Sequence, residues 1–222
     1  MDFDHPKDSQ SQNSNYKVIF GSDKGLVVLV SLLSRQIDQI YQLHDSSINA
    51  LQTGPGYCIT GSDDLYLRVW PLDFSKSHLE LKNDREIIHI DICYDGVKVL
   101  QSTKEGFIGC LQLDTQICRV ILRAHRETVV QIDLDSKGDQ LISLSQDSTM
   151  RIWDQKSLQE TIEFSFPMKD ECTCVLSISE EEILGGFVSG IVRVLSLKTL
   201  QVEEEIFFNK NKIESMGISQ DK

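Results

Sequence analysis

The sequence contains no long run of uncharged apolar residues and has few basic residues for its acidic content. No stretch approaches the roughly 18 apolar residues of a membrane-spanning helix. Met1 to Asn15 are polar and acidic, without the apolar core of a signal peptide. Lys and Arg number 22 against 34 Asp and Glu, which gives a net charge of -12. Because such a surface repels phosphate backbones and anionic lipids, we expect a cytoplasmic protein that binds neither nucleic acid nor membrane directly.

The six cysteines lack the spacing of a metal or redox site. They stand at positions 58, 93, 110, 118, 172 and 174, without a Cys-x-x-Cys pair or a matching His spacing. Cys172 and Cys174 would share one face of a strand, but tetrahedral zinc needs four ligands and no others are in reach. We therefore expect reduced, mostly buried cysteines that pack as small apolar side chains, with no metal and no cofactor.

What the chain does contain is a repeat. Five times, an acidic or turn-forming cluster leads into an apolar strand of the same length. These strands end at Val30, Trp70, Leu111, Trp153 and Leu195, at intervals of 40, 41, 42 and 42 residues. A period near forty residues, ending twice in Arg-x-Trp, is typical of four-stranded β-propeller blades. The sequence predicts an all-β repeat domain over 16–222, after a polar, disordered segment over 1–15.

Each repeat unit is expected to contain four short strands bounded by turn residues. In the clearest unit these are Val129 to Leu134, Gln140 to Leu144, Met150 to Asp154 and Gln159 to Phe164. The same order fits three further whole units, with third strands over Leu65 to Trp70, Phe107 to Leu113 and Ile191 to Leu197. A partial unit at the start has only Tyr16 to Phe20, Leu26 to Val30 and Gln36 to Gln42.

The two ends of the array leave two arrangements open. The first unit lacks a first strand, whereas Ile213 to Ile218 is a lone first strand in an incomplete last unit over 213–222. Either the two ends complete one blade and close a five-bladed ring, or the chain is a fragment of a longer array. Closure matters because an open end leaves strand edges and blade faces unprotected.

Two units carry a matched set of four side chains. The sets are His44, Thr60, Asp64 and Trp70, and His125, Ser143, Asp147 and Trp153. In both sets, Asp follows Ser/Thr by four positions and Trp follows Asp by six. In the second set, Asp154 completes a Trp-Asp dipeptide. At these positions the sequence resembles the WD40 repeat family. The resemblance implies a β-propeller of four-stranded antiparallel blades, in which Asp, His, Ser/Thr and the Trp indole form a hydrogen-bonded chain.

These tetrads are predicted to be structural. A buried indole N–H without an acceptor costs about 1 to 3 kcal/mol, and the hydrogen-bonded chain would satisfy it. A Ser-His-Asp set also occurs in hydrolases, but here no Gly-x-Ser-x-Gly motif accompanies it. We therefore predict no catalytic residues, no small-molecule substrate and no enzyme activity.

The other whole units depart from the pattern. At the Ser/Thr and Asp positions, one has Gln101 and Glu105 and the other has Gly185 and Ser189, and neither has a His in place. We expect these two blades to depend on apolar packing and to be the less stable ones.

Three arginines stand two residues before the end of a third strand: Arg68, Arg151 and Arg193. Strand alternation puts each arginine on the equivalent face of its own blade, so the three together are a candidate recognition surface. The alternative is that each is a solvated arginine whose stem covers its strand.

A propeller without chemistry of its own presents loops rigidly, so the predicted function is protein recognition. The last third of the chain is similar to the long WD-repeat proteins of centrioles and cilia, on the basis of Leu158-Gln159, Glu163-Phe164, Cys172 and the run Gly185 to Val194. This resemblance implies a structural component of a microtubule organelle, with tubulin or a centriolar or ciliary scaffold protein as partner. The acidic charge argues against simple electrostatic adhesion to tubulin. The alternative is a soluble cytosolic adaptor or substrate receptor in signalling or ubiquitin ligation; for the latter, the run Trp153 to Lys156 lacks the expected Arg.

Overall fold

The computed structural model describes residues 17–93, 95–121, 124–135, 138–166 and 170–217. These residues form nineteen β-strands and no helix. The predicted segment over 1–15, the predicted strand residue Tyr16 and the residues 218–222 of the predicted last unit lie outside the described residues.

The strands make five antiparallel sheets in which sequence neighbours pair. The first sheet has three strands: β1 (Lys17–Gly21), β2 (Leu26–Ser31) and β3 (Gln36–Gln42). The second has β4 (Ile48–Gly54), β5 (Tyr57–Ser62), β6 (Tyr66–Pro71) and β7 (Leu79–Lys82). The third has β8 (Ile87–Ile92), β9 (Lys98–Thr103), β10 (Ile108–Gln112) and β11 (Ile117–Ile121). The fourth has β12 (Val129–Leu134), β13 (Gln140–Ser145), β14 (Thr149–Asp154) and β15 (Glu160–Ser165), and the fifth has β16 (Cys172–Ser177), β17 (Glu182–Phe187), β18 (Ile191–Ser196) and β19 (Gln201–Phe207). The predicted all-β fold with four whole four-stranded blades is confirmed.

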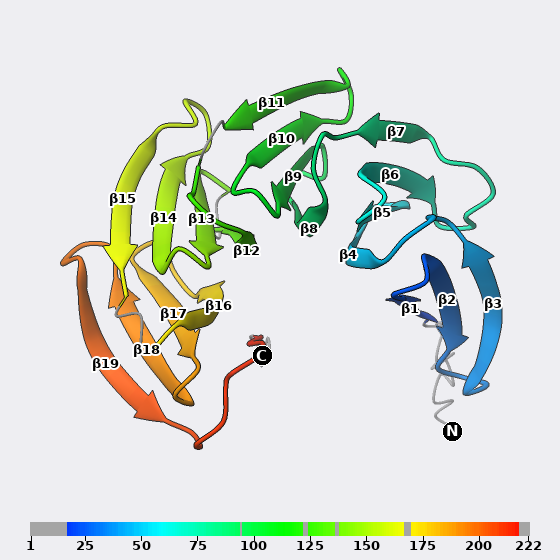
Figure 1. The fold of residues 1–222 in the computed structure, drawn as a ribbon. Coiled ribbons are helices and arrows are strands. Elements are labelled where there is room, and N and C mark those ends of the chain that lie inside the picture. The colour runs from blue at the N-terminus through cyan, green and yellow to red at the C-terminus, as the bar shows by residue number, and fades with distance from the viewer. Residues whose placement is uncertain (1–16, 94, 122–123, 136–137, 167–169, 218–222) are drawn as a thin grey trace, which may run out of the picture.

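The sheets stand side by side in an open arc, with the first strand of each four-stranded sheet on the inside and the fourth on the outside (Figure 1). The two ends of the arc do not meet, so the closed five-bladed ring, one of the two predicted arrangements, is wrong for this structure. The described part of the segment after β19, residues 208–217, does not pair with β1. Instead, Ile213 lies on the fifth sheet, where its N–H donates to the carbonyl of Phe187 at 3.1 Å.

Ile213 occupies the position from which a new inner strand begins. The N–H of Ile48, the first residue of β4, donates to the Ser22 carbonyl of the preceding sheet at 2.9 Å in the same way. In addition, the Thr173 hydroxyl and the Cys174 thiol both reach the Ile213 carbonyl. No strand is assigned over 213–217, but this segment begins as the predicted lone first strand should.

The core lies between consecutive sheets. Alternation along β6 and β14 buries one apolar face of each strand against the next sheet. Between the second and third sheets, for example, Ile59, Leu67 and Val69 pack against Ile87 and Ile90. Small residues allow the close approach: a Cβ at Gly61 would lie 2.5 Å from Cγ2 of Ile87. Neighbouring sheets are therefore held by side-chain packing, without strand pairing between them.

Hydrogen bonds between the inner strands add to this packing. The Asn49 amide donates to the Ile87 carbonyl at 2.9 Å. The Gln131 side chain accepts from the N–H of Val175 at 2.9 Å and donates to its carbonyl at 2.7 Å. Asp133 accepts from the N–H of Ser177 at 3.0 Å. Side chains thus connect β4 to β8 and β12 to β16, which helps to fix the spacing of these blades.

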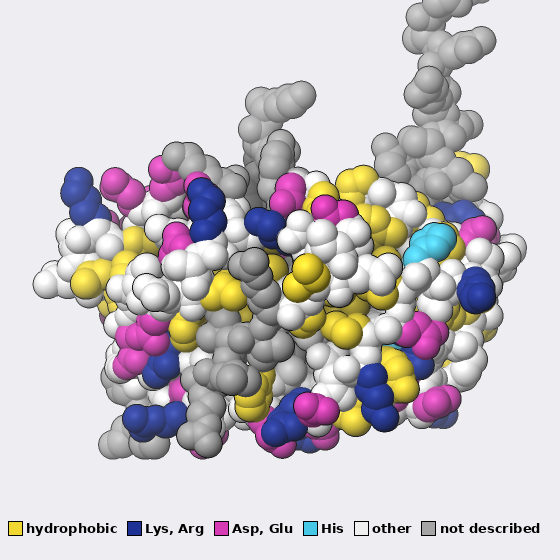
Figure 2. All heavy atoms as spheres, turned by 90° about the horizontal axis from the view of Figure 1, so that it is seen from above, with side chains coloured by type: hydrophobic (Ala, Val, Ile, Leu, Met, Phe, Trp, Pro, Cys, Tyr) yellow, Lys and Arg dark blue, Asp and Glu magenta, His cyan; other side chains and the backbone are white. Residues whose placement is uncertain are grey.

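The surface seen from above carries acidic and basic side chains interspersed with hydrophobic ones (Figure 2). No part of this view has a single charge sign over a large area, so this face has no broad charged patch.

Candidate functional site

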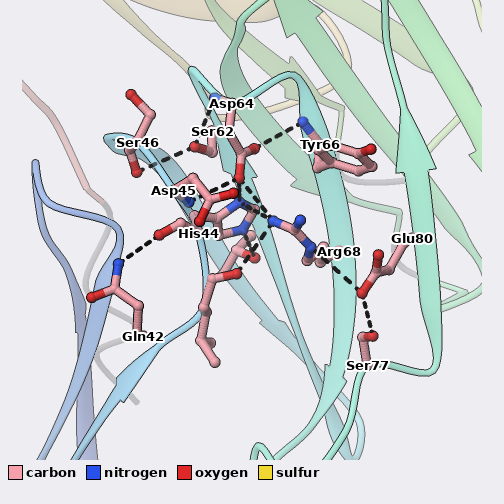
Figure 3. A network of polar contacts seen from close by, with 12 residues as sticks. Gln42, His44, Asp45, Ser46, Ser62, Asp64, Tyr66, Arg68, Ser77 and Glu80 are labelled. Carbon is pink, nitrogen blue, oxygen red and sulfur yellow. Dashed lines mark hydrogen bonds and ion pairs between the residues drawn. The ribbon is translucent and has the colours of Figure 1, made fainter.

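The first tetrad braces the second sheet. His44 follows β3, Thr60 lies on β5, Asp64 in the turn after β5, and Trp70 on β6. His44 Nδ1 lies 2.9 Å from Asp64 Oδ2, and His44 Nε2 lies 2.6 Å from Thr60 Oγ1. Trp70 Nε1 donates to the same Thr60 oxygen at 2.9 Å. The hydrogen-bonded chain therefore runs from a turn carboxylate to a buried indole. Figure 3 shows its carboxylate end, where His44 and Arg68 both contact Asp64.

The second tetrad repeats this geometry in the fourth sheet. His125 Nε2 lies 2.7 Å from Ser143 Oγ, and Trp153 Nε1 donates to that oxygen at 2.8 Å. His125 Nδ1 is 3.2 Å from Asp147 Oδ2, a longer contact than in the second sheet. Thr149 compensates, since its hydroxyl donates to Asp147 at 2.6 Å and lies 3.0 Å from His125 Nδ1. Both predicted sets of four side chains thus lie together.

The protonation states follow from burial and hydrogen bonding. Burial lowers the pKa of His44 and of His125, and it outweighs the opposing effect of the neighbouring carboxylates. Burial raises the pKa of Asp64, but hydrogen bonds from Arg68, the Tyr66 N–H and His44 outweigh this and lower it to about 2. In the second sheet, His44 is therefore a neutral imidazole. Its Nδ1–H donates to the Asp64 carboxylate, and its Nε2 accepts the proton of the Thr60 hydroxyl.

This arrangement does not offer a nucleophile to a substrate. The Thr60 and Ser143 side chains are fully buried, and each hydroxyl is already engaged with an imidazole and an indole. A hydrolytic Ser or Thr must reach the scissile carbonyl of a bound substrate. Both hydroxyls instead satisfy buried donors and acceptors within the blade.

The three arginines predicted as a recognition surface lie against their own sheets. Arg68 contacts Asp64 at 2.9 Å and Glu80 at 3.6 Å, and its side chain is 12% exposed. It also stacks over the Tyr66 ring, with its guanidinium carbon 4.5 Å from the ring centre. The guanidinium therefore faces the blade's own carboxylates, on β7 and in the turn before β6 (Figure 3).

Arg151 and Arg193 repeat this arrangement. Arg151 contacts Glu163 on β15 at 2.9 Å and donates to the Ala124 carbonyl at 2.7 Å. Arg193 contacts Asp170 and Glu205 at 2.7 Å each and lies 4.1 Å over the Phe187 ring. In all three sheets the arginine sits directly opposite a glutamate of the fourth strand. The geometry is that of a strand brace, and a recognition role for these arginines stays a prediction.

The third sheet replaces its missing tetrad with an amide pair. Asn83 stands in the position of the histidine, and Gln101 Nε2 donates to its Oδ1 at 2.7 Å. Asn83 Nδ2 donates back to Gln101 Oε1 at 3.3 Å. Next to this pair, Arg85 is ion-paired with Glu105 and lies 5.1 Å over the Phe107 ring. The apolar packing expected of this blade is present as well, since Ile90, Val99 and Leu111 lie in a buried apolar cluster. The lower stability expected of it stays a prediction.

The fifth sheet uses a different substitute. A Cβ at Gly185 would lie 3.1 Å from the Phe187 ring, so this ring packs where the second and fourth sheets carry the hydroxyl side chains of Thr60 and Ser143. Asp170 accepts from the Ser189 N–H at 3.1 Å and holds Arg193 over the ring. The apolar packing expected of this blade is present too, with Val175, Ile183 and Leu195 in a buried cluster, and the polar contacts of Asp170 add to it. The amide pair of the third sheet was not predicted, although its spacing is visible in the sequence. Asn83 stands eighteen positions before Gln101, and His125 stands eighteen positions before Ser143.

No other chemistry-bearing constellation emerges from the described part of the chain. It contains no group of three or more His, Cys, Asp or Glu that could hold a metal ion. None of the six cysteines, all of which lie within these residues, forms a disulfide. Burial raises the pKa of Cys58, Cys93 and Cys172 to about 12, so these thiols stay protonated. Within the same residues, no helix has the length and apolar character needed to cross a membrane.

Comparison with known proteins agrees with this geometry. Residues 116–154 match the family described as WD domain, G-beta repeat. WD repeat-containing protein 90 of Homo sapiens is 33% identical over 156 residues, which are 70% of this chain and 9% of that protein. The Mus musculus protein of the same name is 33% identical over 79% of this chain and 9% of its own length. Centriole proteome protein 16 of Chlamydomonas reinhardtii is 34% identical over 110 residues, or 50% of this chain and 5% of that protein.

The chain therefore spans less than a tenth of the length of these relatives. Its period, its radial four-stranded sheets and its two buried Asp-His-Ser/Thr-Trp chains are those of the matched repeat. The chain belongs to the WD40 repeat family.

Proposed function

We propose that this WD-repeat interaction scaffold is a non-enzymatic structural component of a centriole, a cilium or another microtubule organelle. The observation that carries the proposal is the 34% identity, over half of the chain, to a protein whose name assigns it to the centriole proteome. The partners would be other proteins of the organelle, such as scaffold proteins or tubulin, and the chain would act from the cytoplasm.

The geometry of the arc supports a structural role. Each four-stranded sheet is braced by buried polar contacts, and consecutive sheets are joined by apolar cores and by side chains of the inner strands. A rigid array of this kind holds its loops in fixed relative positions, which suits a part that must keep its partners in register. The tetrad hydroxyls are buried, so these polar clusters, although they resemble a catalytic set, serve to stabilise the fold and not to catalyse a reaction.

The test is localisation of the tagged full-length protein, compared with the same protein from which residues 17–217 have been deleted. We expect the intact protein to colocalise with a centriole or axoneme marker and to sediment with isolated organelles, and the deletion to reduce both. A diffuse cytosolic pool of intact protein would reject the proposal. Capture of ligase or kinase subunits by that diffuse pool would favour the alternative of a soluble adaptor.

A further inference from the structure

A hollow of about 300 Å³ lies between the third and fourth sheets, beside the turns that follow β10 and β14. Its lining includes Lys98 on β9, Ile117 on β11, and Gln155, Lys156 and Leu158 in the turn after β14. We call it the Lys98 groove. Its volume is at the lower end of the range for ligand pockets, enough for one large side chain and its neighbours.

The charge of the Lys98 groove is opposite to that of the chain. Two lysines and no carboxylate line it, whereas the chain as a whole has a net charge of -12. Other hollows differ, since Glu171, Glu105 and Asp84 each contribute to the lining of one. The lining itself therefore supplies no carboxylate to compete for the two ammonium groups, and the acidic group that pairs with Lys156, Asp139, lies outside it.

The groove is built to present one of these ammonium groups. Gln155 is 7% exposed, and its Oε1 accepts from Lys98 Nζ at 3.2 Å. Its Nε2 contacts the buried Cys93 sulfur at 3.8 Å, which fixes the side chain from behind. Lys98 is thus held in place before any ligand arrives, and this lowers the entropic cost of binding.

The second lysine and the apolar wall complete the groove. Lys156 pairs with Asp139 at 3.4 Å, but both side chains are mostly exposed, and such a pair is worth little and exchanges easily. Ile117 is 57% exposed beside these lysines, and Leu158 is half-buried. A ligand that covers the isoleucine removes apolar surface from water while its charges meet the lysines.

We propose that the Lys98 groove binds an acidic, extended peptide segment of another protein. One large apolar side chain of the segment contacts Ile117 and Leu158, and flanking Asp or Glu residues pair with Lys98 and Lys156. The inference deepens the scaffold role proposed above by naming the class of partner segment that this part of the arc recognises.

The chain provides a matched control within its own repeat. Lys156-Ser157-Leu158-Gln159 follows β14, and Lys198-Thr199-Leu200-Gln201 follows β18 at the equivalent turn of the next sheet. Lys156→Glu can therefore be compared with Lys198→Glu, and Leu158→Ser with Leu200→Ser. Both members of each pair alter the same kind of exposed turn, so an effect on folding alone would appear in both.

The experiment is fluorescence anisotropy of the full chain with a labelled peptide, Gly-Asp-Glu-Leu-Glu-Asp-Gly. One control peptide has Lys in place of each Asp and Glu, and another has Ala in place of Leu. We expect saturable binding of the acidic peptide at concentrations below about 1 mM. Lys98→Gln combined with Lys156→Glu should weaken it by about tenfold or more, and Leu158→Ser should weaken it too, with little change in Lys198→Glu or Leu200→Ser.

Equal weakening in Lys156→Glu and Lys198→Glu, equal binding of the lysine peptide, or no saturation would each overturn the proposal. Sedimentation velocity tests the other candidate occupant, a second copy of this chain. Self-association that Lys156→Glu abolishes would make the groove a contact between copies and would also overturn the proposal. Neither result depends on where the protein resides in the cell, so failure here and failure of the proposed localisation are distinguishable.

Discussion

Replacing Asp91 by Asn is expected to stabilise the chain at neutral pH. Asp91 on β8 and Asp133 on β12 belong to consecutive inner strands, and both carboxyls are largely shielded from solvent. Burial, with the charge of Asp133 as a second cause, raises the pKa of Asp91 from 3.8 to about 6. Burial also raises the pKa of Asp133. At neutral pH the blade junction therefore contains two partly buried carboxyl groups, and both burial and the charge of Asp133 disfavour ionisation of Asp91.

The size and sign of the effect follow from this shift. A rise of roughly two pKa units corresponds to about 3 kcal/mol between the protonation states. Because the pKa is higher in the folded state, this stability is fully present below pH 3.8 and is lost as the pH rises through about 6. Asn cannot ionise, and its side-chain oxygen can still accept from the Ile92 N–H, as Asp91 does at 2.8 Å. The advantage of Asp91→Asn should thus grow between about pH 4 and pH 6 and then level off at about 1 to 3 kcal/mol.

Urea unfolding of both proteins across this pH range measures the difference directly. Comparing the variants at each pH cancels the contribution of the many other carboxyl groups. Asp84→Asn serves as a control, because Asp84 is an exposed carboxylate at the start of the same sheet. A stability difference that is flat between pH 4.5 and pH 7.5, or a destabilised Asp91→Asn at pH 7.5, would show that the hydrogen bonds of Asp91 outweigh its charge.

Further substitutions test the braces of two individual blades. His125→Ala or Asp147→Ala should lower the free energy of unfolding by about 1 to 3 kcal/mol, because each leaves a buried partner of the Ser143–Trp153 chain unsatisfied; unchanged urea midpoints in both variants would contradict this. Gln101→Leu should cost about 1 to 2 kcal/mol, because it removes both partners of the Asn83 amide. Asn83→Leu combined with Gln101→Leu should recover part of that loss, and a double variant no more stable than Gln101→Leu would argue against the amide pair as the cause.

The repeat period allowed most of the strands to be predicted. In the clearest unit, the predicted strands 129–134, 140–144, 150–154 and 159–164 differ from β12 to β15 by at most one residue at any boundary. Strand alternation and turn residues are local signals, so they are readable without the fold. The open arc was not readable in this way, because closure depends on whether two faces far apart in sequence meet.

The polar braces show a different limit. The tetrads were visible because two copies share the same residue types at the same spacing, whereas Asn83 and Gln101 share only the spacing. The contacts of the arginines were harder still to predict, because a guanidinium on a strand face can equally meet solvent or a glutamate of the neighbouring strand. In this chain the register puts Glu80, Glu163 and Glu205 opposite Arg68, Arg151 and Arg193, and register is a property of the folded sheet.

The four-stranded sheets also explain why the repeat tolerates such different residues at equivalent places. What each blade requires is that the buried donors and acceptors near its second and third strands find partners. An imidazole with a carboxylate does this in two sheets, a reciprocal amide pair in the third, and an arginine held over Phe187 by Asp170 in the fifth. Because the requirement is hydrogen-bond satisfaction and not a particular residue, the consensus can be lost while the blade is kept. Sequence variation at these positions is therefore weak grounds for assigning either instability or a binding site to a blade.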